Sequence, residues 1–539
     1  MSTVADRIVA RLQEAGVSHI FGMPGGGGNL DLIDAAGRAG LPFVLTATET
    51  GGAIAAIAQA EITHRPGACL TTLGPGAASV VNGIACAKLE RAPVVVFTDS
   101  YPAAAAACTH QRLDHRALLA PATIWSATLA SDCAEQSVIE ALAHAMRAPG
   151  GPVHLDCPGG VLSRECDDRR VQSSAVARRA DASGSVETRG SAEAIALLRA
   201  SRRPLLLAGL GARLDADAVA ICRLCDDRRV PAMVTYKAKG VVPDDHEWFG
   251  GVFTNAAIER SLIEQADLLI AVGLDPVELI PRPWTFDARI VSFAASEMDD
   301  SHVPFAAQSV GDVAAAIGRL EATLEVSAWD ASVVRTCLDR QRRDPFVGTS
   351  GFSPLRVVEV AAERLARSAR VTVDAGAHMF PVTIGWPVFV PNQMLISNGL
   401  STMGFAMPAA IGAALLDRSR PVVAFTGDGG LLMCAGELAT AVREHLHIIV
   451  IVFADEALSL IEVKQRQRQF PERGVKLGHM SWPALAGAFG AAGFAAGNER
   501  ELGRALEQAI AHGGPSIIEA RVDGRSFDQT VRAIRGQSS

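Results

Sequence analysis

The chain has 539 residues, with 58 Asp and Glu against 50 Lys and Arg, which gives a formal net charge of −8. This balance argues against a nucleic-acid-binding protein, because binding phosphates needs a clustered excess of Lys and Arg. Hydrophobic residues make up 49% of the chain and charged residues 20%, which excludes general disorder and is enough for about three domains. No apolar run reaches the ~18 residues of a membrane span.

The first segment, MSTVADRIVARLQEAG, predicts an amphipathic helix. It lacks the apolar core and the small-residue cleavage site of a signal peptide. We therefore expect a cytoplasmic protein that associates with neither membranes nor nucleic acids.

Three blocks of alternating strands and helices follow along the chain. Apolar runs in the first block are PFVLTAT, ACLTTL and APVVVFTDS; those in the second are RPLLLAGLG, VPAMVTY, ADLLIAVGL and ARIVSFAAS. The third block has RVTVDAG, QMLISNG, RPVVAFTGDGG, HIIVIVFADE and GPSIIEARV. Wholly apolar strands that alternate with helices are typical of parallel sheets covered on both faces. The expected fold class is α/β, with three consecutive open parallel-sheet domains whose ligands bind at the carboxyl ends of strands.

Two polar stretches separate the blocks. Residues 163–190 are rich in Arg, Asp and Ser without apolar periodicity, which is typical of an interdomain linker. A weaker separator covers residues 340–352. The predicted domains are 1–165, 185–335 and 350–539.

The segment with the clearest chemistry begins at Gly427-Asp428-Gly429-Gly430, where a buried strand runs into a loop and then a helix. Free backbone N–H groups at a helix start favour a bound anion. Asp428 supplies an oxygen ligand at this point, and Asp455 supplies another at the end of the next strand, 27 residues further on. Two protein oxygens together with phosphate oxygens are a usual environment for Mg²⁺. A Gly-Asp-Gly alone is also compatible with an ordinary turn.

In this strand–loop–helix–strand context, the sequence resembles the thiamine-diphosphate-dependent enzymes. The likeness covers essentially the whole chain and is closest to the acetolactate synthase-like branch, with pyrimidine-binding, central and diphosphate-binding domains in that order. It implies Asp428, Asp455 and Ala457 as the Mg²⁺ site, and Gly427, Gly429 and Gly430 as contacts of the diphosphate. Where the family commonly has Asn-Asn, this chain has Ala454-Asp455, which adds negative charge near the diphosphate.

Further matches to the family imply the rest of the cofactor site. HIFGMPGGGGNLD places Pro24, Gly25 and Gly26 near the reacting centre, and TATETGGA gives Glu49 as the contact of the aminopyrimidine. The remaining residues that the resemblance implies as cofactor contacts are Gly74 and Asn82 on the pyrimidine side, Gly376, Ala377 and His378 around the diphosphate, and Met403 as the wedge between the two rings. HQRLD matches a family segment of the substrate side, so Gln111 is implied as catalytic, and His110 stands where the family has Phe.

The resemblance also implies how these residues work. Thiamine diphosphate stabilises a carbanion, so the protein has to activate and position it. Met403 would keep the cofactor folded, and Glu49 would hydrogen-bond the pyrimidine nitrogen and promote the imino form. The apolar neighbours of Glu49 favour its protonated form. Because these contacts come from the first and third blocks, the family arrangement implies an obligate homodimer, often a tetramer, with active sites at the subunit interface.

The expected function is that of a decarboxylase or carboligase acting on a 2-oxo acid such as pyruvate. An alternative is a 2-hydroxyacyl-CoA lyase or oxalyl-CoA-type decarboxylase, for which the basic run of Lys464, Arg466, Arg468 and Arg473 would meet CoA phosphates unless it is a solvated helix face. A further alternative is a non-catalytic cofactor-binding subunit. FAD is left open, because Gly209 and Gly211 form only a single glycine pair after a strand.

Overall fold

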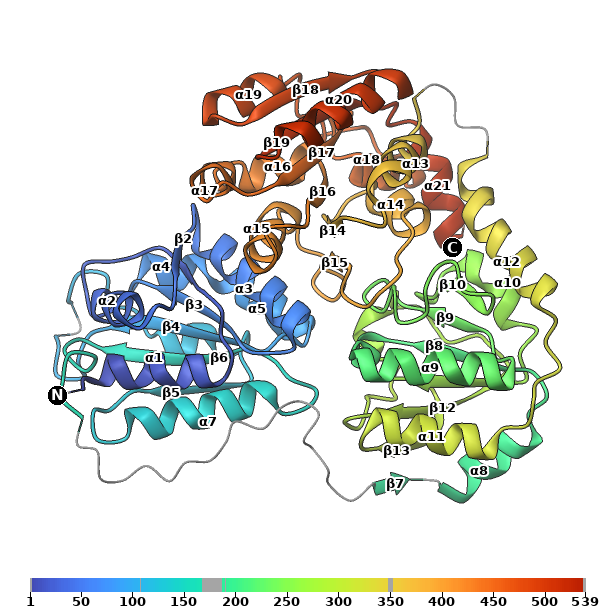
Figure 1. Ribbon diagram of the computed structural model, residues 1–539, viewed down its shortest axis with the longest axis horizontal. Helices are drawn as coiled ribbons and strands as arrows, with labels where there is room; N and C mark the ends of the chain where they lie inside the picture. The colour runs from blue at the N-terminus through green and yellow to red at the C-terminus, as the bar shows by residue number, and fades with distance from the viewer. Residues whose placement is uncertain (1, 107, 167–186, 190, 348–351, 537–539) are drawn as a thin grey trace. The chain divides into compact units, whose positions relative to one another are not determined.

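The computed structural model describes residues 2–106, 108–166, 187–189, 191–347 and 352–536. It contains three sheets with helices around them, shown in blue, green to yellow, and orange to red in Figure 1. The α/β fold class predicted from the sequence is confirmed. The predicted linker lies mostly outside the described residues, as do the predicted limits at 185 and 350. The limit at 335 falls within a helix, α12 (Ala331–Arg343), and the four domain limits stay predictions.

The first sheet has six parallel strands in the order β2-β1-β3-β4-β6-β5. Its strands are β1 (Ile20–Gly22), β2 (Phe43–Leu45), β3 (Gly67–Thr71), β4 (Val94–Ser100), β5 (Trp125–Thr128) and β6 (Val153–Pro158). Its helices are α1 (Val4–Glu14), α2 (Asn29–Ala39), α3 (Glu49–Thr63), α4 (Pro75–Ser79), α5 (Val81–Leu89), α6 (His115–Leu119) and α7 (Ala134–Met146). The predicted N-terminal helix is α1, and it starts with a capping box in which Thr3 and Asp6 bond each other's backbone N–H.

The central sheet has the order β10-β9-β8-β11-β12-β13-β7. Its strands are β7 (Glu187–Arg189), β8 (Pro204–Ala208), β9 (Ala232–Val234), β10 (Phe249–Val252), β11 (Leu268–Val272), β12 (Arg289–Ala294) and β13 (Phe305–Val310). Its helices are α8 (Ser191–Ala200), η2 (Leu210–Ala212), α9 (Asp215–Arg228), η3 (Ala257–Glu259), α10 (Arg260–Ile263), η4 (Pro276–Glu278), α11 (Val313–Thr323), α12 and η5 (Asp344–Phe346). Helices α9 and α11 pack side by side on one face (Figure 1).

Six strands of the central sheet are parallel and change winding direction between β8 and β11, as in a doubly wound sheet. The seventh, β7, runs antiparallel to β13, which the sequence analysis did not anticipate. An antiparallel strand at the edge of a parallel sheet needs no crossover helix and is common in this class.

The third sheet has the order β15-β14-β16-β17-β19-β18, the same strand order as the first sheet. Its strands are β14 (Arg370–Val373), β15 (Met394–Ile396), β16 (Val422–Gly427), β17 (Ile448–Ala454), β18 (Ala492–Ala496) and β19 (Ser516–Arg521). Its helices are α13 (Pro354–Leu365), α14 (Met379–Gly385), α15 (Ala406–Leu416), α16 (Asp428–Cys434), α17 (Glu437–Arg443), α18 (Ser459–Gln467), α19 (Trp482–Phe489), α20 (Glu499–His512) and α21 (Ser526–Arg535).

The described residues form two compact units. One comprises those of Met1–Ala182, Gly399–Ser419 and Cys434–Ile448, and the other those of Ser183–Asn398, Arg420–Met433 and Ile449–Ser539. Helices α15 and α17 come from the third block of the sequence, but they belong to the compact unit of the first sheet. Within that unit, α15 packs against α3. Among the helices of the described chain, none is long and apolar enough to cross a membrane.

Candidate active site

The first unit brings Glu49 and Gly74, both implied for the pyrimidine side, close to Gln111, which is implied for the substrate side. Glu49 is half-buried and is the first residue of α3, which Thr48 caps by accepting a hydrogen bond from Gly51 N–H at 2.9 Å. The carboxylate of Glu49 lies against the turn at Gly74: its Oε1 would be 3.3 Å from a Cβ on Gly76. On the other side of the turn, the backbone oxygen of Gln111 would be 2.7 Å from a Cβ on Gly74. Only glycines leave room for this packing.

Asn82 and Met403 also lie in this unit. Asn82, on α5, donates from Nδ2 to Oγ1 of Thr402 at 3.0 Å, and Thr402 in turn donates to the backbone oxygen of Met403 at 3.2 Å. These bonds hold the backbone at Met403, a half-buried residue in the segment that leads into α15. The structure therefore assembles Glu49, Gly74, Asn82 and Met403 within one compact unit.

The loop of Pro24, Gly25 and Gly26 connects β1 to α2. Gly25 N–H donates to Oδ1 of Asn29 at 3.2 Å. The loop continues over Asp99, whose Oδ2 would be 2.8 Å from a Cβ on Gly27. Burial raises the pKa of Asp99 to about 6, although the backbone N–H of Asn29 favours its charged form. Asp99 was not expected as a site residue from the sequence, where it stands near the end of the apolar run APVVVFTDS.

His110 and Gln111 occupy the long loop before α6. Both side chains are exposed, and Gln111 has a positive φ of 60°. Within the described chain, the His110 side chain forms no hydrogen bond or ion pair. The structure thus places the Gln111 backbone at the Gly74 turn and leaves the two side chains free.

Glu437 supports the turn before Glu49 and was also missed. It is fully buried on α17, and its carboxylate accepts from the backbone N–H of Ala47 at 3.1 Å and of Thr48 at 3.0 Å. Burial raises the pKa of Glu437, against the effect of these hydrogen bonds. In the sequence, GELATAV looks like an ordinary helix start, and no spacing rule links it to residues 390 positions earlier.

In the second unit, β16 ends at Gly427 and α16 begins at Asp428. The sequence analysis placed the helix after the four-residue loop, so this position is corrected: Gly429 and Gly430 lie in its first turn. Gly430 packs closely on buried polar groups, because its Cβ would be 2.5 Å from Oδ2 of Asp374 and 2.6 Å from Oγ1 of Thr426. Larger residues would displace this end of the strand.

Asp428 and Asp455 are neighbours. Oδ2 of Asp428 accepts from the backbone N–H groups of Asp455 at 2.9 Å and Glu456 at 2.8 Å, and its Oδ1 accepts from the Trp482 indole at 2.7 Å. Burial raises the pKa of Asp428. Burial and the nearby Asp428 carboxylate raise the pKa of Asp455 to about 6, although Ser459 donates a hydrogen bond to it.

The remaining residue implied for the metal is Ala457, whose N–H donates to Oδ1 of Asp455 at 3.3 Å. Over the described residues, there is no cluster of three or more His, Cys, Asp or Glu that could hold a metal. A cation at Asp428 and Asp455 therefore needs ligands from elsewhere. This fits Mg²⁺, which takes backbone carbonyls, water and phosphate oxygens alongside one or two carboxylates.

Gly376, Ala377 and His378 follow β14. His378 is buried, stacks on Phe453 with ring centroids 5.5 Å apart, and would have its Nδ1 3.1 Å from a Cβ on Gly427. Its Nε2 is buried and has no partner among the described residues. Burial lowers the pKa of His378 to about 4, so the ring is neutral at pH 7. The ring thus borders Gly427 through Nδ1, and its buried Nε2 is left for a group that binds at this edge of the sheet.

The Gly209–Gly211 turn gives no support for FAD. The backbone N–H of Leu210 donates to Oε2 of Glu278 at 2.8 Å, so a carboxylate occupies the amide that a dinucleotide phosphate would use. Burial raises the pKa of Glu278 to about 7. The carboxylate also accepts from the Thr235 hydroxyl at 2.5 Å.

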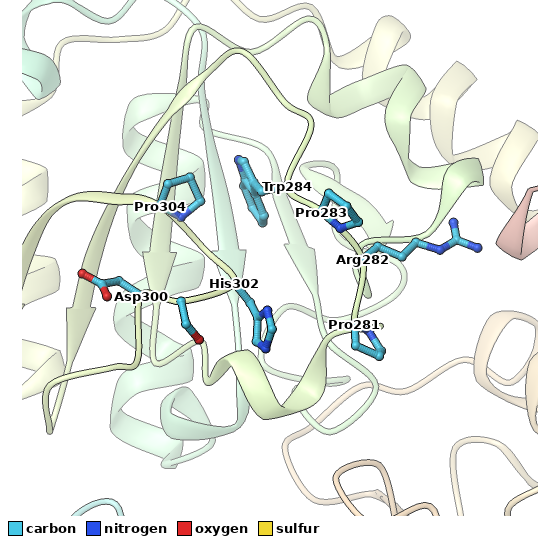
Figure 2. Close-up of a pocket in the computed structure, with 8 residues that line it drawn as sticks. Pro281, Arg282, Pro283, Trp284, Asp300, His302 and Pro304 are labelled. Atoms are coloured by element: carbon cyan, nitrogen blue, oxygen red, sulfur yellow. The ribbon is translucent and has the colours of Figure 1, made fainter. Parts of the chain in front are cut away.

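A cavity of about 460 Å³ lies on the loops before and after β12 (Figure 2). Its lining comprises Pro281, Arg282, Pro283, Trp284, Asp300, Ser301, His302 and Pro304. Arg282 extends away from His302 and Pro304, and its guanidinium donates to the backbone oxygen of Arg535 (Figure 2). None of the residues implied by the sequence lines this cavity.

Comparison with known proteins identifies the family. Three family profiles match the chain: "Thiamine pyrophosphate enzyme, N-terminal TPP binding domain" over residues 2–118, the central domain over 191–320, and the C-terminal TPP binding domain over 374–520. The chain is 30% identical to the catabolic acetolactate synthase of Raoultella terrigena, over 97% of this chain and 95% of that protein.

Two other relatives cover the chain as fully. Identity is 29% to the acetolactate synthase of Bacillus subtilis (strain 168), over 96% of this chain and 93% of that protein. It is 28% to a probable 2-ketoarginine decarboxylase of Pseudomonas aeruginosa, over 96% of this chain and 94% of that protein. The three matched domains and the full-length relatives lead to one conclusion: this chain belongs to the thiamine-diphosphate-dependent enzymes, in the acetolactate synthase-like branch.

Proposed function

We propose that the protein is a thiamine-diphosphate- and Mg²⁺-dependent decarboxylase or carboligase that acts on a 2-oxo acid such as pyruvate. The observation that carries the proposal is that one chain holds both groups of residues that a thiamine diphosphate site would need. Glu49, at the Gly74 turn, forms one half, and the adjacent Asp428 and Asp455 form the other. The names of the relatives, acetolactate synthases and a 2-ketoarginine decarboxylase, support a 2-oxo acid as the substrate class.

The residues of each half have separate tasks. Bound thiamine diphosphate would supply a carbanion-stabilising group. Asp428 and Asp455 would hold Mg²⁺ against the diphosphate, and the loop of Gly376, Ala377 and His378 would border the same anion. Glu49 would hold a proton at the pyrimidine nitrogen, and Met403 would keep the two rings in a bent arrangement. Gln111 and His110, on an exposed loop, would meet the substrate.

We further propose a homodimer or tetramer with active sites at the subunit interface. The two halves of the site lie in two separate compact units of the chain. In the proposed dimer, one subunit supplies the Glu49 half of each active site and its partner supplies the Asp428 half.

The alternative that uses acyl-CoA is less well supported. Arg466 pairs with Glu462 at 3.8 Å and with Glu472 at 3.9 Å, so part of the basic run on α18 is neutralised. Lys464, Arg468 and Arg473 are exposed, as expected for a solvated helix face. A non-catalytic subunit would have no need for Glu49 and Met403.

The test is release of CO₂ from a panel of 2-oxo acids, with pyruvate and oxalyl-CoA included, by purified protein supplied with thiamine diphosphate and Mg²⁺. We expect release from at least one 2-oxo acid and none from oxalyl-CoA. Glu49→Gln should abolish release, and the matched change Glu140→Gln on exposed α7 surface should not. Cofactor binding without release from any compound would favour the non-catalytic subunit.

A further inference from the structure

A buried histidine holds the Gly74 turn. His115 is the first residue of α6 and is 3% exposed. Its Nε2 accepts a hydrogen bond of 3.0 Å from the backbone N–H of Gly74. Gly74 has φ of 60° and ψ of −103°, a conformation that other residues rarely adopt. The hydrogen bond from Gly74 N–H thus holds a turn whose conformation requires glycine.

The direction of this hydrogen bond fixes the tautomer of His115. A backbone N–H can only donate, so Nε2 must carry a lone pair and the ring proton must be on Nδ1. Nδ1 lies 3.1 Å from Oδ1 of Asp156, at the end of β6, and donates to it. Burial acts to raise the pKa of Asp156, but hydrogen bonds from His115 and Ser100 outweigh it, so the pKa is lowered and the carboxylate is charged.

We propose that Asp156 and His115 are positioning residues: Asp156 sets the tautomer of His115, and His115 holds the Gly74-Pro75-Gly76 turn against which Glu49 rests. The role of the turn toward a cofactor rests on the proposed function. The hydrogen bonds from Gly74 to His115 and from His115 to Asp156, here called the relay, do not depend on the proposed function. Gly76 lies beside Oε1 of Glu49, so a displaced turn would move the support of that carboxylate. No motif marks His115 or Asp156 in the sequence.

A second histidine in the same unit provides a matched control. His154 lies on β6, like Asp156, and is fully buried. Its Nε2 lies 2.8 Å from the Thr98 hydroxyl and its Nδ1 lies 3.0 Å from the Ser126 hydroxyl. Neither contact involves the Gly74 turn or His115; the Thr98 hydroxyl also contacts Oδ1 of Asp156 at 3.0 Å, a contact between two side chains that His154→Asn leaves unchanged. His154→Asn therefore reports what losing a buried histidine costs the fold, without removing the acceptor for Gly74.

Two substitutions of His115 separate its two hydrogen bonds. The amide of Gln reaches about as far as Nε2, so His115→Gln retains an acceptor for Gly74 N–H. The amide of Asn overlaps the position of Nδ1, so His115→Asn retains a donor to Asp156 and loses that acceptor. Asp156→Asn keeps the size of the side chain but removes the charge that selects the Nδ1–H tautomer, and it should act like His115→Asn.

The first measurement is amide hydrogen–deuterium exchange of the cofactor-free protein over residues 72–80. We expect exchange about tenfold faster in His115→Asn and Asp156→Asn, since a buried hydrogen bond is worth on the order of one factor of ten. Exchange in His115→Gln and His154→Asn should stay close to native. The second measurement is the dissociation constant of thiamine diphosphate, which should rise in the same two variants and recover in His115→Gln.

The relay is wrong if His115→Gln and His115→Asn exchange equally fast, or if His154→Asn opens the turn as much as His115→Asn. If His115→Asn does not fold, Asp156→Asn replaces it: exchange over residues 72–80 should be faster in Asp156→Asn than in His154→Asn, and equal exchange would contradict the relay. The exchange pattern needs no cofactor. If the variants show the expected exchange pattern but the native protein binds no thiamine diphosphate, the proposed function is wrong and the positioning of the Gly74 turn by His115 and Asp156 is still supported.

Discussion

The indole Nε1 of Trp482 donates a 2.7 Å hydrogen bond to Oδ1 of Asp428, and both side chains are almost completely buried. Backbone N–H groups of the loop after β17 hold the other carboxylate oxygen. The carboxylate is therefore held in one orientation from two sides. Such second contacts orient metal ligands and commonly change metal affinity 10–100-fold when they are lost.

Trp482→Phe should weaken Mg²⁺ binding by about tenfold, because it removes the N–H that orients Asp428. The measurement is the Mg²⁺ concentration at half-maximal binding of thiamine diphosphate, by equilibrium dialysis. Trp386→Phe is the matched control: Trp386 is equally buried, and its indole N–H has no partner among the described residues. Equal shifts in the two variants would show that Trp482 acts through packing alone.

Asp455→Asn should bind thiamine diphosphate at least as well as native protein. Both side chains offer an oxygen to Mg²⁺ and to Ala457 N–H, and Asn removes one negative charge near the diphosphate. Asp455→Ala deletes the ligand and should weaken binding. If Asn were as damaging as Ala, the charge of Asp455 would be required, and chelator titrations of the three proteins would show whether metal loss is the cause.

Asp99→Asn should stabilise the fold at neutral pH. Burial raises the pKa of Asp99 from 3.8 to about 6, so the folded protein binds its proton more tightly than the unfolded chain does. The contribution of Asp99 to stability is therefore highest below pH 4 and falls as the pH rises to about 6. Above pH 7 the native carboxylate costs up to about 3 kcal/mol relative to a neutral side chain.

The measurement is the difference in melting temperature between Asp99→Asn and native protein at several pH values. We expect a gain that grows between about pH 4 and pH 6 and then levels off. Asp132→Asn, on an exposed turn, is the control and should show no such trend. A gain that is the same at all pH values would mean that the pKa of Asp99 is the same in the folded and the unfolded protein.

His110→Phe should change the products or the pH dependence of turnover and leave cofactor affinity unchanged. The imidazole is exposed on the loop next to Gln111, at a position where the resembling family has Phe, so it can exchange protons with a bound intermediate. Product analysis with pyruvate and a pH–rate profile would measure this. Identical products and profiles would make His110 a bystander.

The sequence predicted the parts of the fold that have a local signal. The run IIVIVFA is the strand β17, and the Gly-Asp-Gly motif located Asp428 and Asp455, which the structure makes neighbours. Strand β6 was not predicted, because VHLDCP contains His154 and Asp156 and does not look apolar. Strand β18, AGFAA, resembles Ala-rich helical text instead.

The missed site residues have no local signal at all. Trp482 meets Asp428 across 54 residues, and His115 meets Gly74 across 41. Each pair depends on how strands are ordered in a sheet and on which loops then share an edge. Periodicity and motif spacing do not encode such distances, so these contacts had to come from the structure.

The central claim is that Glu49 activates the cofactor, and exchange of the C2 proton of thiamine diphosphate into D₂O tests it most directly. Glu49→Gln keeps the size and one hydrogen bond but cannot share a proton with the pyrimidine nitrogen. Compared at equal cofactor occupancy, exchange in Glu49→Gln should be slower by at least about 10²–10⁴-fold, the usual contribution of a positioned acid or base. Unchanged exchange would show that Glu49 is only a structural carboxylate and would contradict the proposed catalytic function.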